Sequence, residues 1–323
     1  MLAKATLANT DLQVSQLCYG TNMLGTAIDQ GQANEILDTF VELGGNFLDT
    51  ARSYGDWIPD APVGASERAI GAWLKGRKRE DVVIATKGCF MDLRVGDWRN
   101  RVTPADLAVD IGQSLEHLGI DSIDLYWLHA DNPEAPVQPI IDALIEHQQA
   151  GRIRYFGASN WTPERVREAN AYAASIGHQG FVACQPFWGL AVPNRENAAQ
   201  QGYLYYYEDG FQSLHADGLT MIPYSAQSGG YFTKRAAGGL EAVPEALRAR
   251  HDNPANDARL QAVQDVAQKR GVSINEVVLA YLTSQPYPTI PIFGGRLPEQ
   301  IRDSVKAVAL KLTAEELKQL QAG

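Results

Sequence analysis

The strongest constraint on the fold is an alternation, repeated along the whole chain, of short apolar segments with segments of helical periodicity. Eight of the apolar segments are four to seven residues long and apolar on both faces, which is typical of parallel strands covered by helices on each side. Eight such units in 323 residues favour a closed (β/α)8 TIM barrel over an open doubly wound sheet. The predicted strands are 17–20, 46–49, 82–86, 122–128, 154–158, 181–184, 219–224 and 288–292.

Two further features complete the predicted architecture. Residues 5–16 carry the turn formers Asn9, Thr10 and Asp11 between short apolar stretches, which predicts a β-hairpin ahead of the barrel. No linker-like stretch divides the chain, so we expect a single barrel domain over residues 1–323. Three strand-end loops are long for α/β connections, and loops of such length are usually functional or mobile. They span 90–100, 189–210 and 232–256.

Charge and cysteine content narrow the compartment and the partners. The net charge of −10 disfavours nucleic acid and anionic membranes, which attract clustered Lys and Arg. The first residues lack the apolar core of a signal peptide, and no apolar run approaches the roughly 18 residues of a membrane span. Cys18, Cys89 and Cys184 are an odd number without metal-like spacing, as expected for buried free thiols in a reducing cytosol. We therefore expect a cytoplasmic protein without nucleic-acid or membrane partners.

Polar residues gather where the predicted strands end, and active sites of such barrels lie at the C-terminal ends of the strands. Each residue has an ordinary structural explanation: Asp49 could cap a helix, Lys87 could be a solvated charge, and His129 could be satisfied internally. Their combination on three successive strands, with Tyr54 in the adjoining loop, favours a catalytic site instead. The polar strand ends are Thr21, Asp49, Lys87, His129, Ser159-Asn160, Gln185, Tyr224-Ser225 and Gly294-Gly295-Arg296.

The residue types fit the reduction of a carbonyl group. Hydride addition puts negative charge on the carbonyl oxygen, so the site needs a proton donor and a stabilising cation or dipole. Tyrosine has an ordinary pKa of about 10 and is a poor acid at neutral pH, but a neighbouring ammonium such as Lys87 lowers that pKa. Asp49 would keep Lys87 charged and oriented, and His129 could hydrogen-bond the substrate oxygen. Tyr54 is the candidate acid.

With these residues in place, the chain resembles the aldo-keto reductase family over nearly its whole length. The resemblance implies a (β/α)8 barrel that uses NADPH without a metal, with a catalytic group of Asp49, Tyr54, Lys87 and His129 and with Tyr54 as the general acid. The matching motifs are Phe47-Leu-Asp-Thr-Ala-x-x-Tyr-Gly55, Ile84-Ala-Thr-Lys87, Ile123-Asp-Leu-Tyr-Trp-Leu-His129, Gly151-Arg-Ile-Arg-Tyr-Phe-Gly-Ala-Ser-Asn160, Cys184-Gln185-Pro186, Pro223-Tyr-Ser225 and Pro291-Ile-Phe-Gly-Gly-Arg-Leu-Pro-Glu-Gln300.

The resemblance also implies where the cofactor contacts lie. Hydrogen bonds to the nicotinamide carboxamide, stacking on its ring, and contacts to the ribose and pyrophosphate would come from successive strand ends, where small residues and backbone N–H groups suit phosphate. In order along the cofactor these residues are Ser159, Asn160 and Gln185 for the carboxamide, Tyr224 for the ring, Gly20 and Thr21 beside the ribose and pyrophosphate, Ser225, Gln227, Ser228 and Gly230 around the pyrophosphate, and Gly294, Gly295, Arg296, Gln300 and Ser304 at the adenosine end.

The adenosine end departs from the family pattern. Many members have a lysine, a serine, an arginine and an asparagine or glutamate where this chain has Gly294, Gly295, Gln300 and Ser304. Arg296 is left as the obvious cation for a 2′-phosphate, a role that suits its planar guanidinium. We therefore expect NADPH, with use of NADH possible. The loop 226–233 also replaces the usual proline- and leucine-rich version, which can alter pyrophosphate clamping or substrate access.

Aromatic residues in or beside the strand-end loops bear on the substrate. Trp57, Trp98 and Trp188 are the candidates for a pocket wall, whereas Trp127 lies inside a predicted strand and fits core packing equally well. Aromatic walls serve hydrophobic carbonyls and the apolar faces of sugars alike, so aldehydes, ketones and oxidised sugars all stay open. The run Tyr203–Tyr207 fits a lid, a dimer contact or local packing. The full aromatic set is Trp57, Phe90, Trp98, Trp127, Trp161, Phe187 and Trp188.

Two other classes of protein compete with a reductase. One is a cofactor-binding regulatory subunit, like the potassium-channel β subunits that resemble reductases. The intact catalytic group argues for chemistry, and the lack of long polar or basic tails argues against a docking role. The other is an unrelated metal-dependent barrel enzyme, which would need a His/carboxylate cluster that the sequence does not offer.

Overall fold

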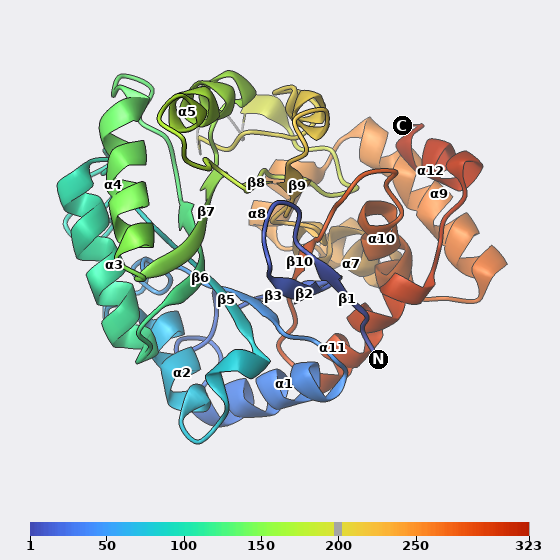
Figure 1. Ribbon diagram of the computed structural model, residues 1–323. Helices are drawn as coiled ribbons and strands as arrows, with labels where there is room; N and C mark the ends of the chain where they lie inside the picture. The colour runs from blue at the N-terminus through green and yellow to red at the C-terminus, as the bar shows by residue number, and fades with distance from the viewer. Residues whose placement is uncertain (197–201, 323) are drawn as a thin grey trace.

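The structure, a computed structural model, describes residues 1–196 and 202–322. Eight parallel strands form one sheet in the order β10-β3-β4-β5-β6-β7-β8-β9, and Figure 1 shows them curled inside a ring of helices. The Met221 amide donates to Pro288 O (3.1 Å) and the Ile290 amide to Met221 O (2.9 Å), which joins the two sheet edges. The predicted (β/α)8 barrel is therefore confirmed. Its strands are β3 (Cys18–Gly20), β4 (Phe47–Asp49), β5 (Val83–Gly88), β6 (Ile123–Leu128), β7 (Ile153–Ser159), β8 (Ala183–Gln185), β9 (Thr220–Met221) and β10 (Ile292–Phe293).

Helix starts follow from the capping residues in the sequence. The Thr103 side chain accepts from the Asp106 amide with Pro104 at the first helical position, and Thr162 caps the helix at Pro163 in the same way. None of the helices within the described residues has the length and apolarity to cross a membrane. The α-helices whose bounds lie within the described residues are α1 (Gln30–Glu42), α2 (Ala65–Leu74), α3 (Pro104–Leu118), α4 (Val137–Gln149), α5 (Pro163–Ser175), α7 (Tyr231–Gly238), α8 (Glu245–His251), α9 (Pro254–Arg270), α10 (Ile274–Thr283), α11 (Pro298–Ser304) and α12 (Ala314–Gln321).

The three predicted long loops have different outcomes. Residues 90–100 form a loop that turns back on itself through an antiparallel bridge between Asp92 and Asp97. Within 189–210, residues 197–201 lie outside the described residues. The stretch 232–256 is not a loop throughout, because it contains α7 and α8. These two helices have eight and seven residues, too few for helical periodicity to stand out, and the Gly-Gly pair at the end of α7 has the composition of a turn.

The N-terminal hairpin is confirmed, and it closes one end of the barrel. Strands β1 (Lys4–Thr6) and β2 (Gln13–Ser15) pair antiparallel, and Figure 1 shows them, in dark blue, across the middle of the ring. Leu7, Leu12 and Val14 pack in one cluster with side chains of the barrel interior such as Leu125 and Trp127. Arg154, near the start of β7, donates to the hairpin residue Asp11 (2.7 Å). The hairpin therefore covers the N-terminal end of the strands and leaves the C-terminal end for the site.

The packing inside the barrel can be tested at Gly157. Gly157 in β7 lies against Trp127, and a Cβ atom there would stand 2.4 Å from the indole ring and 2.8 Å from Ala183 O. Gly157→Ala is expected to destabilise the protein by about 1–3 kcal/mol through overpacking, measured as a lower urea midpoint. Gly112→Ala in α3 is the control, because nothing lies within 4 Å of its new Cβ and alanine favours helix. Equal midpoints for the two variants would contradict the close packing of Trp127 on β7.

Candidate active site

The four predicted catalytic residues meet at the C-terminal ends of three adjacent strands. Asp49 ends β4, Lys87 is the penultimate residue of β5, and His129 follows β6 directly. Tyr54 lies in the turn after β4, where its amide donates to Ala51 O (3.1 Å). Asp49 and Lys87 are buried, with 2% and 1% of their surfaces exposed. Neighbouring parallel strands thus bring Asp49 and His129, which are 80 positions apart in the sequence, into one site.

Lys87 is the hub of this group. Its ammonium donates to the Asp49 carboxylate, to Thr50 O (2.8 Å) and to the Tyr54 hydroxyl (3.0 Å). These three contacts use all three N–H donors of a lysine ammonium. Gln185 donates to the second Asp49 oxygen (3.0 Å), so the carboxylate is held from two sides. The arrangement orients the lysine toward the tyrosine hydroxyl and fixes its distance.

The electrostatics of the group place a protonated tyrosine beside a charged lysine. Burial lowers the pKa of Lys87, but the charges and hydrogen bonds of Asp49 and Tyr54 outweigh it and leave that pKa raised. Burial raises the pKa of Tyr54, and the Lys87 ammonium opposes this rise without cancelling it. The expected net lowering of the Tyr54 pKa is therefore not found, because desolvation of a phenolate costs more than one ammonium returns. Tyr54 carries its proton at neutral pH.

His129 is neutral and partly enclosed. Burial, and after it the charge of Lys87, lower the pKa of His129 well below its ordinary value. Its ring stacks on Phe90 at 4.4 Å and meets the Tyr54 ring edge-on at 6.0 Å. Its Nδ1 atom is buried without a hydrogen-bond partner among the described residues. A neutral imidazole carries one N–H, which suits a hydrogen bond to a carbonyl oxygen rather than an ion pair.

The residues predicted to hold the nicotinamide lie in the same hydrogen-bonded network. Ser159 donates to Gln185 O (3.0 Å), and the Tyr224 hydroxyl donates to Asn160 Oδ1 (2.7 Å). The Asn160 amide in turn donates to His129 O (3.1 Å). Phe187 and Tyr203 support the Tyr224 ring at centroid distances of 5.3 and 5.9 Å. The strand ends therefore present an aromatic ring beside polar side chains, next to the catalytic group.

The turn after Tyr224 has features that fit a phosphate. Ser225, Ser228, Gly229 and Gly230 all have positive φ, and α7 begins directly after this turn without a side-chain cap. The Ser228 hydroxyl is buried and has no hydrogen-bond partner among the described residues. An unpartnered hydroxyl beside a left-handed turn that leads into a helix suits an anionic ligand. The pyrophosphate of a dinucleotide is such a ligand.

Gly20 and Thr21 lie at the end of β3 as predicted, and both are packed closely against the rest of the protein. A Cβ atom on Gly20 would stand 2.8 Å from the Ile292 side chain, so the close packing of β3 and β10 requires glycine. The Thr21 hydroxyl donates to Asp49 O (2.9 Å) and lies 2.9 Å from the Ser66 hydroxyl. Thr21 is buried, and its backbone amide also donates to Asp49 O (3.0 Å), so Thr21 is engaged with the protein itself and its contact with a cofactor stays a prediction.

The predicted adenosine-end residues also form one group. Gln227 accepts from the Gly294 amide (2.8 Å), and Gln300 accepts from the Arg296 amide (2.6 Å). Tyr19 donates to Gly295 O (2.9 Å). Asn275 joins the group by donating to Ser304 Oγ (3.0 Å) and accepting from Gln227 (2.7 Å). Asn275 was not predicted, since only the fold brings α10 to this end of the barrel.

A second cation missed by the sequence analysis lies near Arg296. Partial burial, and after it the charge of Arg296, lower the pKa of Lys234 on α7. Lys234 also donates to Gly229 O in the turn that precedes its helix. Together with Arg296, Lys234 would offer a 2′-phosphate more positive charge than Arg296 alone. No sequence signal pointed to Lys234, because it belongs to the stretch read as a loop.

The predicted pocket-wall tryptophans separate into two kinds. Trp57 is 50% exposed and meets the Tyr54 ring at 6.1 Å, and Trp98 in the loop 90–100 is 71% exposed. Trp188 is buried and stacks on Tyr206 at 3.6 Å, within the core cluster. Its surroundings are those of a packing residue, so Trp57 and Trp98 are left as wall candidates. Trp127 is fully buried inside the barrel.

Of the three readings of the Tyr203–Tyr207 run, local packing is what the structure shows for these residues. Tyr205 and Tyr206 are buried, and the Tyr206 hydroxyl contacts His215 Nε2. The Tyr207 and Tyr281 hydroxyls lie 2.7 Å apart, which ties the run to α10. Tyr203 packs against Tyr224, as described above, so this run supports the ring that is predicted to stack on the nicotinamide.

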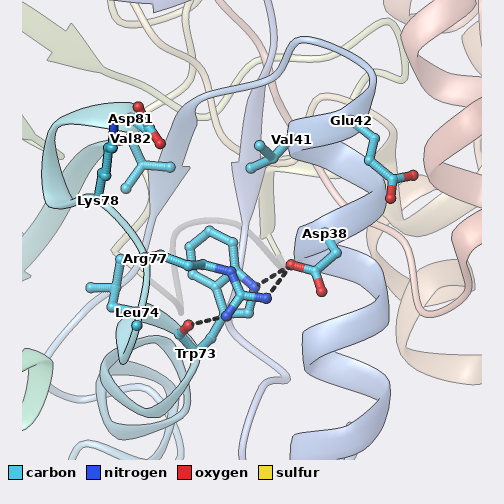
Figure 2. Close-up of a pocket in the computed structure, with 10 residues that line it drawn as sticks. Asp38, Val41, Glu42, Trp73, Leu74, Arg77, Lys78, Asp81 and Val82 are labelled. Atoms are coloured by element: carbon cyan, nitrogen blue, oxygen red, sulfur yellow. Dashed lines mark hydrogen bonds and ion pairs between the residues drawn. The ribbon is translucent and has the colours of Figure 1, made fainter.

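A surface pocket of about 490 Å³ lies between α1 and α2, away from the catalytic group. Figure 2 shows that Trp73 and Arg77 both bond Asp38, at 2.8 and 2.6 Å, so the pocket's central charges are already paired. Val82, which lines it, precedes β5, so the pocket lies at the N-terminal end of the strand that carries Lys87 near its other end. In residues 1–196 and 202–322 no group of three His, Cys, Asp or Glu side chains could hold a metal ion.

The closed barrel and the buried acid–lysine–tyrosine–histidine group at its strand ends are those of an oxidoreductase enzyme. The chain belongs to the aldo/keto reductase family, whose model matches residues 16–322. The resemblance stated from the motifs is thereby confirmed.

Curated relatives cover nearly the whole chain. A putative aryl-alcohol dehydrogenase of Saccharomyces cerevisiae is 29% identical, over 96% of this chain and 83% of its own length. An uncharacterized oxidoreductase of Bacillus subtilis is 31% identical, over 97% of this chain and 93% of its own. Norsolorinic acid reductase B of Aspergillus parasiticus is 27% identical, over 96% and 81%. Among solved structures, the thermostable aldo-keto reductase Tm1743, crystallised with the inhibitor epalrestat, is similar with a TM-score of 0.73 and 25% identity over 99% of both chains.

Proposed function

We propose that this enzyme reduces a carbonyl group to an alcohol with NADPH, and that Tyr54 is the general acid. The observation that carries the proposal is the contact of the Lys87 ammonium with both the Asp49 carboxylate and the Tyr54 hydroxyl (3.0 Å). A buried ammonium next to a phenol stabilises the phenolate that remains after the proton has left. The second contact sets the ammonium directly against the hydroxyl that would release the proton.

The residues divide the work as follows. NADPH, when bound, would supply the hydride. Tyr54 would give its proton to the substrate oxygen, and Lys87 would hold the charge left on Tyr54. The neutral His129 would donate a hydrogen bond to the same oxygen and so fix its approach. Ser159, Asn160, Gln185 and Tyr224 would hold the nicotinamide, and the turn containing Ser228 would hold the pyrophosphate.

Aromatic carbonyls are the substrates that we propose to test first. Trp57 stands partly exposed against Tyr54, and Phe90 stacks on His129, so aromatic rings border the two groups that would meet the carbonyl oxygen. Flat rings favour flat apolar substrates through stacking and edge contacts. Relatives named aryl-alcohol dehydrogenases support the same choice. Ketones and oxidised sugars belong to the same panel.

The test is oxidation of NADPH by the purified protein with 4-nitrobenzaldehyde, methylglyoxal and a panel of ketones and oxidised sugars. Carbonyl-dependent oxidation of NADPH, with the alcohol identified as product, is the expected result. A protein that binds NADPH yet reduces no member of the panel would instead favour the regulatory subunit resembling potassium-channel β subunits. Failure to bind either NADPH or NADH would remove the cofactor proposal itself.

We make two wider proposals, on the extent of the domain and on the location of the protein. We treat residues 1–323 as one barrel domain, because the hairpin packs with the barrel interior and α12 packs near α9. We also propose a cytoplasmic location, supported by Cys18, Cys89 and Cys184, which are all free and buried. The proposed partner is a small carbonyl substrate, without nucleic acid or membrane.

Cofactor choice yields a separate prediction. Arg296→Ala is expected to weaken NADPH binding by about tenfold or more and NADH binding by less than about twofold, because a guanidinium pairs with a 2′-phosphate that NADH lacks. Both dissociation constants can be measured from quenching of tryptophan fluorescence. Arg302→Ala is the control, an exposed arginine on the neighbouring α11. Equal losses for both cofactors would show that Arg296 does not distinguish them.

A further inference from the structure

Five residues of alternating charge form a series of ion pairs beside the active site. Arg101 pairs with Asp110 (3.0 Å), Asp110 lies 3.7 Å from Arg52, Arg52 pairs with Asp56 (3.1 Å), and Asp56 pairs with Arg94 (2.7 Å). This series of ion pairs begins at Arg101, just before α3, passes through Asp110 on α3 and ends in the loop 90–100. The proposed reaction uses none of these side chains. Their role must therefore be sought in what they hold in place.

The last ion pair of this series, Asp56–Arg94, joins the two loops that border the catalytic group. Asp56 belongs to the loop between β4 and α2, which carries Tyr54 and Trp57, and Arg94 belongs to the loop between β5 and α3. The Asp56 side chain is 1% exposed, so its charge is compensated by arginine rather than by water. Arg94 also donates to Ala61 O (2.8 Å), a second bond to the first loop.

Arg94 is the tether of the second loop's tip. The base of this loop is held at one end by the Cys89 amide on Asp110 (2.8 Å) and at the other by Asn100 on Asp131 O (2.7 Å). Within the described residues, the hydrogen bonds and ion pairs from 91–99 to other parts of the chain all come from Arg94. Loss of this side chain would leave the tip attached only through its two ends.

The two loops place aromatic rings around the reacting groups. The first loop sets Trp57 against Tyr54 at 6.1 Å, and the second sets Phe90 against His129 at 4.4 Å and carries the exposed Trp98. A small carbonyl needs only Tyr54 and His129, whereas a substrate with a ring would also contact these walls. The spacing of the loops therefore bears on large substrates and hardly on small ones.

We propose that the Asp56–Arg94 pair determines specificity, by holding the two loops at the spacing that lets a ring-bearing carbonyl bind against Trp57 and the loop 90–100. Arg94 is thus a positioning residue rather than a catalytic one. The inference rests on the proposed carbonyl reduction and adds to it the residues that select among carbonyls. An ion pair between loops serves this purpose well, since it fixes spacing without filling the pocket.

The experiment compares Arg94→Gln with the unchanged protein on a large and a small substrate. The KM for 4-nitrobenzaldehyde is expected to rise about tenfold, because small displacements of a binding wall cost affinity for the ring. The kcat/KM for methylglyoxal and the Kd for NADPH are expected to stay within about twofold of those of the unchanged protein. Neither methylglyoxal nor NADPH is expected to contact the tip of the loop. Arg94→Lys, which keeps the charge but cannot bond Asp56 and Ala61 in the same fork, is expected to fall between the two proteins.

Arg99→Gln is the matched control. Arg99 lies in the same loop and pairs with Asp97, but that pair stays within the loop and its arginine is 88% exposed. Its loss should change neither substrate. Hydrogen exchange of segment 91–99, read by mass spectrometry, adds a measurement independent of turnover: Arg94→Gln should raise it and Arg99→Gln should not.

The outcomes separate this inference from the function on which it rests. Unchanged kinetics and exchange in Arg94→Gln, or equal losses for both substrates, would overturn the specificity role while leaving carbonyl reduction in place. If the unchanged protein reduces no carbonyl, the proposed function fails, and the specificity role fails with it, even where the exchange data show the tether.

Discussion

Tyr54→Phe is expected to lower kcat for carbonyl reduction by about 10³-fold while leaving the Kd for NADPH unchanged. A positioned proton donor contributes about 10²–10⁴-fold to such a reaction, and phenylalanine has no proton to give. The substitution is conservative for the structure, because the ring that the Lys87 ammonium approaches at 4.8 Å is retained. The hydroxyl bonds Lys87 and no predicted cofactor residue. Steady-state kinetics with 4-nitrobenzaldehyde and fluorescence titration with NADPH measure the two quantities.

Tyr172→Phe is the control for this experiment. Its hydroxyl also makes a single side-chain hydrogen bond, donating to Asp142 (2.7 Å), but it lies on α5 away from the strand ends. Its loss should leave kcat unchanged. Retained turnover in Tyr54→Phe would remove Tyr54 as the acid and would leave His129 as the nearest proton donor to examine.

The parts of the fold that the sequence predicted well are those whose signal is local. Strands such as β6 are apolar runs that need no distant partner to be recognised, and the helix start at Pro104 follows from a threonine cap next to a proline. The catalytic group was predictable for a related reason. Strand ends of a barrel must meet, so the order of Asp49, Lys87 and His129 along the chain already places them side by side.

The parts that the sequence did not predict depend on distant contacts. Trp188 has the sequence position of a pocket residue, but Tyr206 stacks on it and removes it to the core. Lys234 comes near Arg296 only because α7 forms where turn composition predicted a loop. The Tyr54 pKa follows burial, which no spacing in the sequence reveals. In each case the deciding partner lies on another element, so periodicity carries no information about it.

Asp49→Asn is expected to lower kcat by about 10²-fold near neutral pH and to move the fall of kcat at alkaline pH to lower pH. Burial lowers the pKa of Lys87, and in the unchanged protein the charges of Asp49 and Tyr54 override this and keep it raised. Asparagine preserves the size of the side chain but supplies no charge, so burial would then dominate and the pKa of Lys87 would fall. A neutral amine cannot stabilise the Tyr54 phenolate, which removes an electrostatic contribution of that order. The pH dependence of kcat measures both effects.

The pH dependence of stability provides the second measurement, because the contribution of Lys87 to it has opposite signs in the unchanged protein and in Asp49→Asn. With its folded pKa raised, Lys87 stabilises the unchanged protein below its unfolded pKa of about 10.4 and loses this contribution as pH rises through the folded pKa. In Asp49→Asn the folded pKa lies below the unfolded one, so the unfolded chain binds more protons between these values. The free energy of unfolding of Asp49→Asn should therefore increase with pH across that interval, as read from urea midpoints.

Asp38→Asn separates this effect from the loss of any carboxylate. Asp38 also pairs with a cation, Arg77 at 2.6 Å, but both side chains are well exposed, so no buried charge is left behind. Exposed pairs contribute little, and this variant should keep both the pH dependence of kcat and that of stability. If Asp49→Asn kept the unchanged protein's alkaline limb, Asp49 would not set the charge of Lys87. The lysine would then have to be held charged by Tyr54 and Thr50 O alone, and the proposed order of roles, from carboxylate to ammonium to phenol, would be wrong at its first step.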